Sequence, residues 1–171
     1  MSQKTAKMYL GPIFVGLVVF LISGCATTEE VRRTDVETAR KIYLQGMEDI
    51  VSADYEAAIQ GFTEVSQFPR FMKYSALGKL RLGDTLYFQG RYLEAVEVYE
   101  EFAVLYPRNP NLSYAKFMAA RSLFARMPAE VAFFSPAARL DMTRVLQARD
   151  KLQAFLRTSP DSPFALEAST M

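Results

Sequence analysis

Apolar and polar residues follow two different patterns along this chain of 171 residues. Residues 9–22 form an almost unbroken apolar run, YLGPIFVGLVVFLI. From residue 36 onward the apolar side chains recur every three or four positions, which is typical of helices with one buried face. The sequence therefore predicts a short apolar segment at the N-terminus, followed by an all-α domain.

Proline, glycine and polar clusters interrupt the helical pattern and indicate where helices begin and end. Helices are predicted over residues 36–51, 54–68, 72–88, 91–105, 112–127 and 141–157. A further helix is expected within residues 162–169, where Ser162 would be the N-cap and Pro163 would take the first helical position.

The helical region contains an internal repeat. The segment DYEAAIQGFTEVSQFP (54–69) resembles RYLEAVEVYEEFAVLYP (91–107) at a shift of 37 positions, and RVLQARDKLQAFLRTSP (144–160) follows at a further 53. Two sets of positions are equivalent in this alignment: Ala58, Ala95 and Ala148, and then Phe62, Tyr99 and Leu152. The third copy therefore carries about 16 additional residues.

A small residue stands twelve positions before each repeated alanine, once the additional residues are subtracted: Gly46, Gly83 and Ala120. A small residue in the first helix, another in the second and a proline after the second resemble the tetratricopeptide repeat. Small residues let two antiparallel helices approach closely, and proline cannot extend a helix. The large residues at positions 62, 99 and 152 are expected to fill the space between repeats.

The predicted fold is thus a tetratricopeptide-like solenoid of helical hairpins over residues 36–171. Three repeats cover approximately residues 36–70, 71–110 and 111–161, and residues 162–171 begin a fourth. A repeat array needs a polar cap on its last interface. Because this array ends within a repeat, the sequence is expected to be a fragment or a truncated product.

The N-terminal apolar run has the features of a targeting segment. Lys4 and Lys7 precede it and small residues follow it. Fourteen helical residues would extend about 21 Å, which is short of the roughly 30 Å hydrocarbon core of a bilayer. The pattern favours a signal peptide over residues 1–24. An uncleaved N-terminal anchor is the alternative.

The single cysteine of the chain, Cys25, lies where the apolar run ends. The preceding residues Ile22, Ser23 and Gly24 resemble the bacterial lipobox, which a signal peptidase recognises before it cleaves in front of the cysteine. Cys25 is therefore the expected attachment site for a diacylglyceryl group and further acyl chains such as palmitate, and two or more chains anchor a protein stably.

The residues after Cys25 bear on its location. Residue 26 is alanine, and the absence of aspartate at this position favours the outer membrane, with the protein facing the periplasm. Residues 25–35, the lipidated cysteine and a polar stretch without apolar periodicity, are predicted to be a tether.

Composition argues against several functions. Twenty Lys and Arg residues nearly balance 19 Asp and Glu residues, so a nucleic-acid partner is not expected. The chain has no histidine, and its one cysteine would be acylated. No Gly-rich phosphate loop or metal-ligand spacing is present in the sequence. We therefore expect no enzyme, no metal site and no cofactor other than the covalent lipid.

Two segments carry a resemblance to a known family. These are YPRNPNLSYAKFMAARSLFARM (106–127) and the inserted AFFSPAARLD (132–141). With the lipobox and the repeats, they make the chain, from Cys25 to its end, similar to the BamD family of lipoproteins, which belong to the β-barrel assembly machinery of Gram-negative outer membranes. Members of that family usually have about five repeats, and the C-terminal repeats that dock on the barrel-bearing subunit have no counterpart here.

The resemblance implies a scaffold that binds unfolded outer membrane proteins, the barrel-bearing core subunit and other lipoproteins of the machinery. In tetratricopeptide arrays the first helix of each repeat lines the concave face, which would form a peptide-binding groove. Its expected lining is Arg40, Tyr43, Met47, Leu77, Asp84, Tyr87, Phe88, Tyr114, Phe117, Arg121 and Phe124. The alternative is that many of these aromatic residues belong to the helix–helix core.

Two further questions stay open at this point. The adjacent Phe133 and Phe134 in the insertion either contact a partner or the membrane surface, or they fold back over the third repeat. Another tetratricopeptide lipoprotein is the alternative function, either a pilotin for pilus or secretin assembly or a scaffold of the cell envelope and cell division.

Overall fold

The computed structural model describes residues 33–69, 73–125 and 138–171, with side chains from residue 145 onward in the last range. Residues 22–25, which carry the lipobox, and the pair Phe133 and Phe134 lie outside the described residues. The chain divides into two units, Met1–Thr38 and Ala39–Met171. The described part of the first unit, residues 33–38, is helical, and the following paragraphs concern the second unit.

The described residues form helices connected by turns and loops. A helix covers residues 33–51. It is followed by α2 (Tyr55–Ser66), α3 (Lys73–Phe88), α4 (Tyr92–Leu105), α5 (Leu112–Ala125), α6 (Ala138–Thr158) and α7 (Ala165–Thr170). Every end lies within three residues of its predicted position.

Two local predictions were wrong. Residues 33–35 were assigned to the tether but are helical. Helix α7 begins at Ala165, with Phe164 as its N-cap, so Pro163 does not occupy the first helical position. The reason is a preceding turn in which the N–H of Ala165 donates to the carbonyl of Ser162, which leaves Pro163 in the turn.

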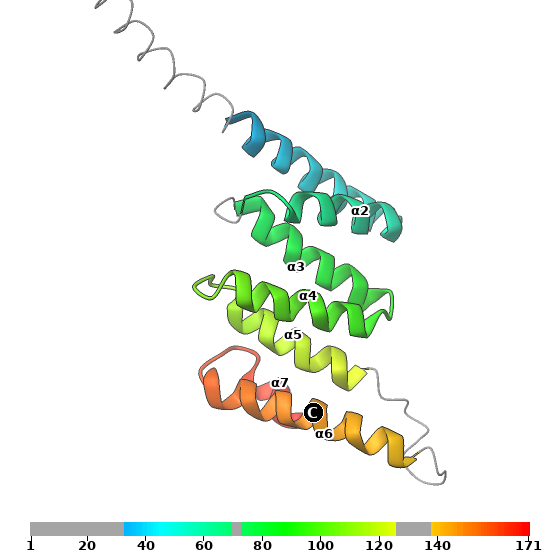
Figure 1. The fold of residues 1–171 in the computed structure, drawn as a ribbon, viewed down its shortest axis with the longest axis vertical. Helices are drawn as coiled ribbons and strands as arrows, with labels where there is room; N and C mark the ends of the chain where they lie inside the picture. Colours follow the sequence, from blue (N-terminus) through cyan, green and yellow to red (C-terminus); the bar gives the residue numbers. More distant parts are fainter. Residues whose placement is uncertain (1–32, 70–72, 126–137) are drawn as a thin grey trace, which may run out of the picture. The chain divides into compact units, whose positions relative to one another are not determined.

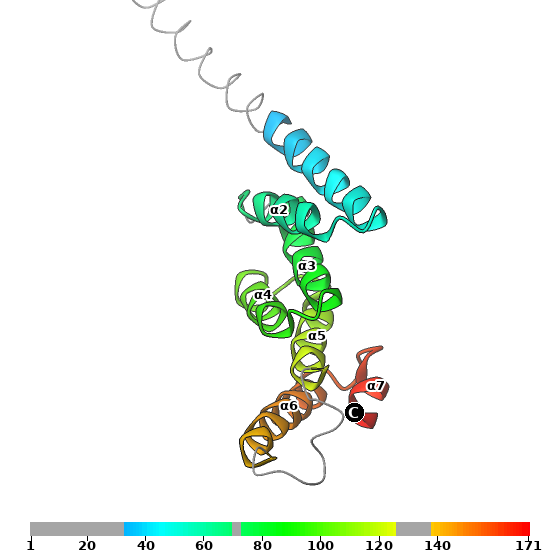
Figure 2. The ribbon, with the colours of Figure 1, turned by 90° about the vertical axis from the view of Figure 1, so that its right-hand side faces the viewer.

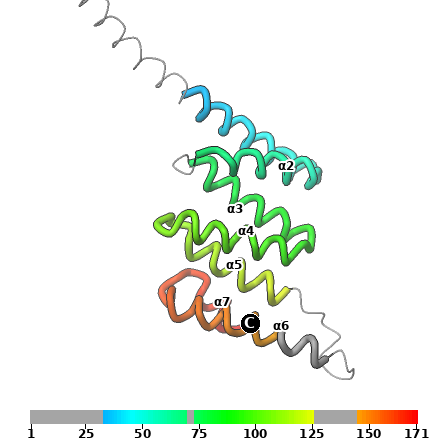
Figure 3. The backbone as a smooth tube through the Cα atoms, viewed as in Figure 1, coloured from blue at the N-terminus to red at the C-terminus, as the bar shows by residue number. Residues whose placement is uncertain are grey.

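Each helix packs on the next one in the chain: α2 on α3, α3 on α4, α4 on α5, α5 on α6 and α6 on α7 (Figure 1). Seen from the side, α2, α4 and α6 form one layer, and α3, α5 and α7 form the other (Figure 2). The backbone trace follows the successive antiparallel hairpins (Figure 3). The second unit is therefore an all-α, tetratricopeptide-like solenoid. Below, "A helices" denotes residues 39–51, α3, α5 and α7, and "B helices" denotes α2, α4 and α6.

Glycine and an aromatic ring interlock within a hairpin. A Cβ atom on Gly46 would lie 2.9 Å from Cε1 of Phe62, and one on Gly83 would lie 2.7 Å from Cε1 of Tyr99. Phe62 and Tyr99 were expected to fill the space between repeats, and the structure places each ring against the glycine of its own hairpin. All predicted packing residues are buried: Gly46, Ala58, Phe62, Gly83, Ala95, Tyr99, Ala120, Ala148 and Leu152.

The two A-to-B turns that the structure describes have the same backbone form. Ala53, before α2, has φ of 61°, and Gly90, before α4, has φ of 75°. These positions are equivalent in the 37-residue repeat. The side chain of Asp54 then caps α2 by accepting a hydrogen bond from the N–H of Ala57 at 3.1 Å. Both repeats therefore have a left-handed backbone conformation at this turn position. Glycine adopts that conformation more readily than alanine does.

Candidate functional site

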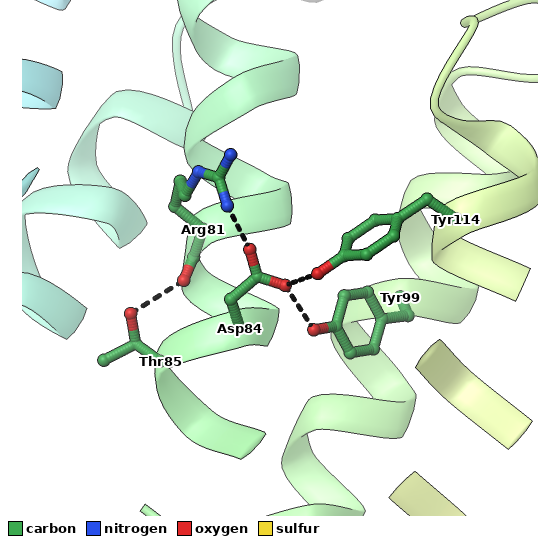
Figure 4. A network of polar contacts seen from close by, with 5 residues as sticks. All are labelled: Arg81, Asp84, Thr85, Tyr99 and Tyr114. Carbon is green, nitrogen blue, oxygen red and sulfur yellow. Dashed lines mark hydrogen bonds and ion pairs between the residues drawn. The ribbon is translucent and has the colours of Figure 1, made fainter. Parts of the chain in front are cut away.

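A buried carboxylate joins three helices of the array. Asp84 on α3 is only 4% exposed. Its Oδ1 accepts hydrogen bonds from the hydroxyl of Tyr99 on α4, at 2.6 Å, and from the hydroxyl of Tyr114 on α5, at 2.7 Å. Its Oδ2 pairs with Arg81 at 2.6 Å (Figure 4). A buried charge is tolerated when it is paired and hydrogen-bonded, as here.

The two tyrosines respond to this environment. Burial, and then the negative charge of Asp84, raise the pKa of Tyr99 far above its ordinary value. The same two causes raise the pKa of Tyr114. Both hydroxyls therefore remain protonated donors at any physiological pH. The network is built to hold α3, α4 and α5 together, and Asp84 is not available to a ligand.

Arg81 extends the network toward the first repeat. Its side chain is 40% exposed and bonds Asp84 one helical turn away. Burial opposes its charge, but a side-chain hydrogen bond with Tyr43 and the charge of Asp84 outweigh burial and raise the pKa of Arg81. Sequence reasoning did not single out Arg81. Its spacing of three residues from Asp84 was the available signal, since such pairs face each other on a helix.

A second cluster centres on Arg121 of α5. Its guanidinium lies 5.6 Å from the ring centroid of Tyr87 on α3 and 6.0 Å from that of Phe117 on its own helix. It also forms an ion pair with Glu167 of α7 at 3.2 Å. Arginine stacks favourably on aromatic faces. The cation thus connects three successive A helices.

Phe164, at the start of α7, completes this cluster. Its ring is stacked on that of Phe117, with the centroids 5.1 Å apart and the planes at 10°. It also packs at 5.5 Å against Tyr114, which reaches the Asp84 network. Neither Phe164 nor Glu167 was predicted as a site residue, because their chain segment was interpreted only as the start of a repeat.

The structure places the predicted groove residues in three classes. Arg40 and Phe88 are exposed, and the Phe88 side chain is 73% exposed. Partly buried residues are Tyr43, Met47, Leu77, Tyr87, Tyr114, Arg121 and Phe124. The assignments of Asp84 and Phe117 to the groove were wrong, because both are buried, Asp84 by its three partners and Phe117, 1% exposed, between the rings of Phe155 and Phe164.

Neighbouring A helices also contact through other aromatic residues. Tyr43 lies 5.6 Å from Tyr74 of α3, measured between ring centroids. Tyr87 packs edge-on to the exposed Phe88 at 6.1 Å and to Tyr92 of α4 at 5.3 Å. Phe88, Tyr87 and Arg121 therefore form a continuous aromatic and cationic surface from α3 to α5. We call these three residues the Phe88–Arg121 surface.

The described residues also bear on metal binding and on membrane crossing. Within residues 33–69, 73–125 and 138–171, acidic residues form no group of three that could hold a metal ion. Over the same residues, no helix combines the length and apolar character needed to cross a bilayer.

Comparison with known proteins gives two findings. The model of the YfiO family, whose description is "Outer membrane lipoprotein", matches residues 35–171. The outer membrane protein assembly factor BamD of Caulobacter vibrioides is 27% identical over 114 residues, which cover 65% of this chain. The same residues cover 37% of the length of that relative. Because the family match extends over residues 35–171, which is most of the chain, the chain belongs to the BamD-like YfiO family of outer membrane lipoproteins.

Proposed function

We propose that this protein is a lipid-anchored periplasmic scaffold of the outer membrane β-barrel assembly machinery. It binds unfolded outer membrane proteins and partner subunits and promotes folding and insertion of the barrels. Membership of the YfiO family supports the general role. Its mechanism is binding rather than turnover, and acyl chains on Cys25 keep the repeat domain at the periplasmic face of the outer membrane.

The observation that carries the proposal is the Phe88–Arg121 surface. Phe88 is exposed although it is a large aromatic residue, and its ring packs against that of Tyr87, which Arg121 also contacts. Strands of membrane barrels alternate apolar and polar residues and are rich in aromatic residues at the membrane interfaces. An extended segment of that kind can place its apolar side chains on aromatic rings that successive repeats supply.

The positive charge of the Phe88–Arg121 surface also suits an unfolded barrel segment. The Arg121 side chain remains 38% exposed and presents a guanidinium group at the surface. Guanidinium groups recognise carboxylates through paired N–H donors. An unfolded chain that carries aromatic side chains and a carboxylate would therefore match both components of the Phe88–Arg121 surface.

The test is depletion of the protein in its native host, with folded barrel content measured by heat-modifiable gel mobility. We expect a general loss of folded barrels, restored by the wild-type chain. Phe88→Ala should restore them poorly, whereas Val104→Ala should restore them fully. Val104 on α4 is a matched control, because it is 77% exposed but lies on a B helix away from the surface.

The contrary outcome would be equally clear. Normal barrels after depletion, together with a defect confined to pili, secretion or division, would exclude the assembly role. The protein would then be another lipid-anchored repeat scaffold. Circular dichroism of both variants would show that neither substitution disturbs the fold.

A further inference from the structure

The second and third repeats differ in the partner of one lysine. Lys79 on α3 and Lys116 on α5 are equivalent, because they are 37 positions apart in the repeat. Lys79 is 7% exposed, and its Nζ pairs with a carboxylate oxygen of Glu101 on α4 at 2.5 Å. At the shift of 53 positions, Glu101 corresponds to Ala154 on α6. Both hairpins therefore carry the lysine, but the third hairpin lacks the carboxylate.

A cavity lies where this carboxylate is missing. It has a volume of about 400 Å³, and both Lys116 and Ala154 line it. Much of the remaining lining is apolar and includes Ala103 of α4, Ala119 of α5 and Phe155 of α6. The cavity is thus formed by α4, α5 and α6, and none of its lining residues belongs to the Phe88–Arg121 surface.

The charge of Lys116 has no counterpart nearby. The side chain is partly buried, and within residues 33–69, 73–125 and 138–171 it forms no ion pair. One carboxylate lines the cavity, that of Glu100 on α4, and it is paired with Lys151 of α6. A charge that is partly removed from water is favourable only when an opposite charge compensates it. The cavity therefore offers a cation to a carboxylate from outside the chain.

We propose that the cavity at Lys116 is a docking site for a partner protein, which inserts an acidic side chain where the second repeat uses Glu101. The inserted carboxylate pairs with Lys116, and an apolar side chain beside it in the partner covers Ala103 and Ala154. Charge complementarity selects this occupant, and so does the Lys79 pair, in which a protein helix supplies a glutamate to the equivalent cation. The site does not depend on the proposed function, which concerns the A helices.

Ala154→Glu tests the geometry without a ligand. The new carboxylate would enter the cavity beside Lys116, as Glu101 does beside Lys79. We expect this substitution to raise the midpoint of thermal unfolding in the wild-type chain and to raise it less, or to lower it, in a Lys116→Met background. The same change of the midpoint in both backgrounds would overturn the site, because the cavity would then not hold a carboxylate against Lys116.

The second experiment measures binding by the purified full-length chain. The probe is the blocked peptide Ser-Leu-Glu-Leu-Ser, and its counterpart has glutamine in place of glutamate. Binding is followed through the amide NMR signals of Ala119 and Ala154 in the isotope-labelled chain. We expect the glutamate peptide to bind about two- to five-fold more tightly than the glutamine peptide, which is the range that a partly exposed ion pair provides.

Three variants assign the binding to the cavity. Lys116→Met should abolish the preference for the glutamate peptide. Ala154→Glu should prevent binding of both peptides, because its own side chain fills the cavity. The matched control is Lys41→Met, which removes an exposed lysine of the first helix and should leave both affinities unchanged.

The contrary results are specific. Equal affinities for the two peptides, or binding that does not respond to Ala154→Glu, would overturn the docking site. Tighter binding of hexanoate than of the glutamate peptide would assign the cavity to a small aliphatic carboxylate and would overturn the choice of a protein partner. Each of these results would leave the proposed function standing, because the barrel content after depletion decides that function independently.

Discussion

Gly83 and Tyr99 are in direct contact across the hairpin of α3 and α4, and a Cβ atom on the glycine would lie 2.7 Å from Cε1 of the tyrosine. The same relationship joins Gly46 and Phe62 in the preceding repeat, at the same separation of 16 residues along the chain. The absence of a side chain on the A helix lets the ring of the B helix lie flush against its backbone. This pair sets how closely the two helices of a repeat approach.

Gly83→Ala should therefore destabilise the protein, although alanine is the better helix former. The added methyl group overlaps a fully buried ring, and overpacking of this kind costs about 1–3 kcal/mol. Gly61→Ala is the control, because the nearest atoms to its Cβ would be 3.8 Å away. It should stabilise α2 by up to about 1 kcal/mol. Urea unfolding measures both, and a stabilising Gly83→Ala would contradict the interlock.

The equivalent turn residues allow a reciprocal test. Ala53 has φ of 61°, in the left-handed region that alanine disfavours, whereas Gly90 has φ of 75° in the next repeat. Ala53→Gly should raise the free energy of unfolding and Gly90→Ala should lower it, each by about 1 kcal/mol. Effects of the same sign for both substitutions would show that the two turns are not equivalent.

Removal of the buried carboxylate should be among the most damaging single substitutions. Asp84→Ala leaves two tyrosine hydroxyls without their acceptor, at about 1–3 kcal/mol each, and removes the ion-pair partner of Arg81. Tyr114→Phe removes one hydrogen bond to a charged group, at about 1.5–3 kcal/mol. Asp150→Ala, at an exposed pair with Arg149, should change stability little. Equal effects of Asp84→Ala and Asp150→Ala in thermal unfolding would refute the network.

The same network predicts sensitivity to alkali. The pKa values of Tyr99 and Tyr114 are raised in the folded state above the ordinary value of 10.0. Above that pH the unfolded chain loses these protons while the folded protein keeps them. The associated stability is therefore fully present below about pH 10 and falls as the pH rises toward the folded-state values. Urea unfolding between pH 8 and pH 11 should show this fall, and Tyr99→Phe with Tyr114→Phe should reduce its slope.

Cys25→Ser tests the lipid anchor. The variant should lose metabolic labelling with palmitate, remain unprocessed as a larger species on gels, and fail to reach the outer membrane fraction. These effects follow because serine cannot form the thioether to the diacylglyceryl group. Normal labelling of the variant would place the lipid on another residue.

The repeat pattern was sufficient to predict the helices and their closest contacts. Gly46 and Gly83 recur at fixed spacing from Phe62 and Tyr99, and the spacing of a repeat is a property that sequence displays directly. Helix ends were predictable from the proline, glycine and polar clusters between the helices. The predicted start of α7 was wrong because a serine followed by proline suits both a helix N-terminus and a turn. Here these residues form the turn.

The candidate site was less accessible to prediction. Periodicity shows that Asp84 and Phe117 lie on A helices, but it does not show which side chains of other helices cover them. Asp84 is buried because Tyr99 and Tyr114 donate to it from α4 and α5, and Phe117 is buried because Phe155 and Phe164 pack on it. Partners separated by 15 to 47 positions leave no local signal.

The Asp84 network also bears on how such an array can evolve. Repeat arrays gain and lose hairpins readily when each repeat contacts its neighbours through interchangeable apolar surfaces. At the boundary between the second and third repeats, however, the Asp84 carboxylate of the second repeat accepts hydrogen bonds from Tyr99 of the second repeat and from Tyr114 of the third. A duplicated or exchanged hairpin that brought the acid without both tyrosines would bury an unsatisfied charge. Asp84, Tyr99 and Tyr114 are therefore most favourable when all three are present, and this junction constrains which hairpin can follow the second repeat.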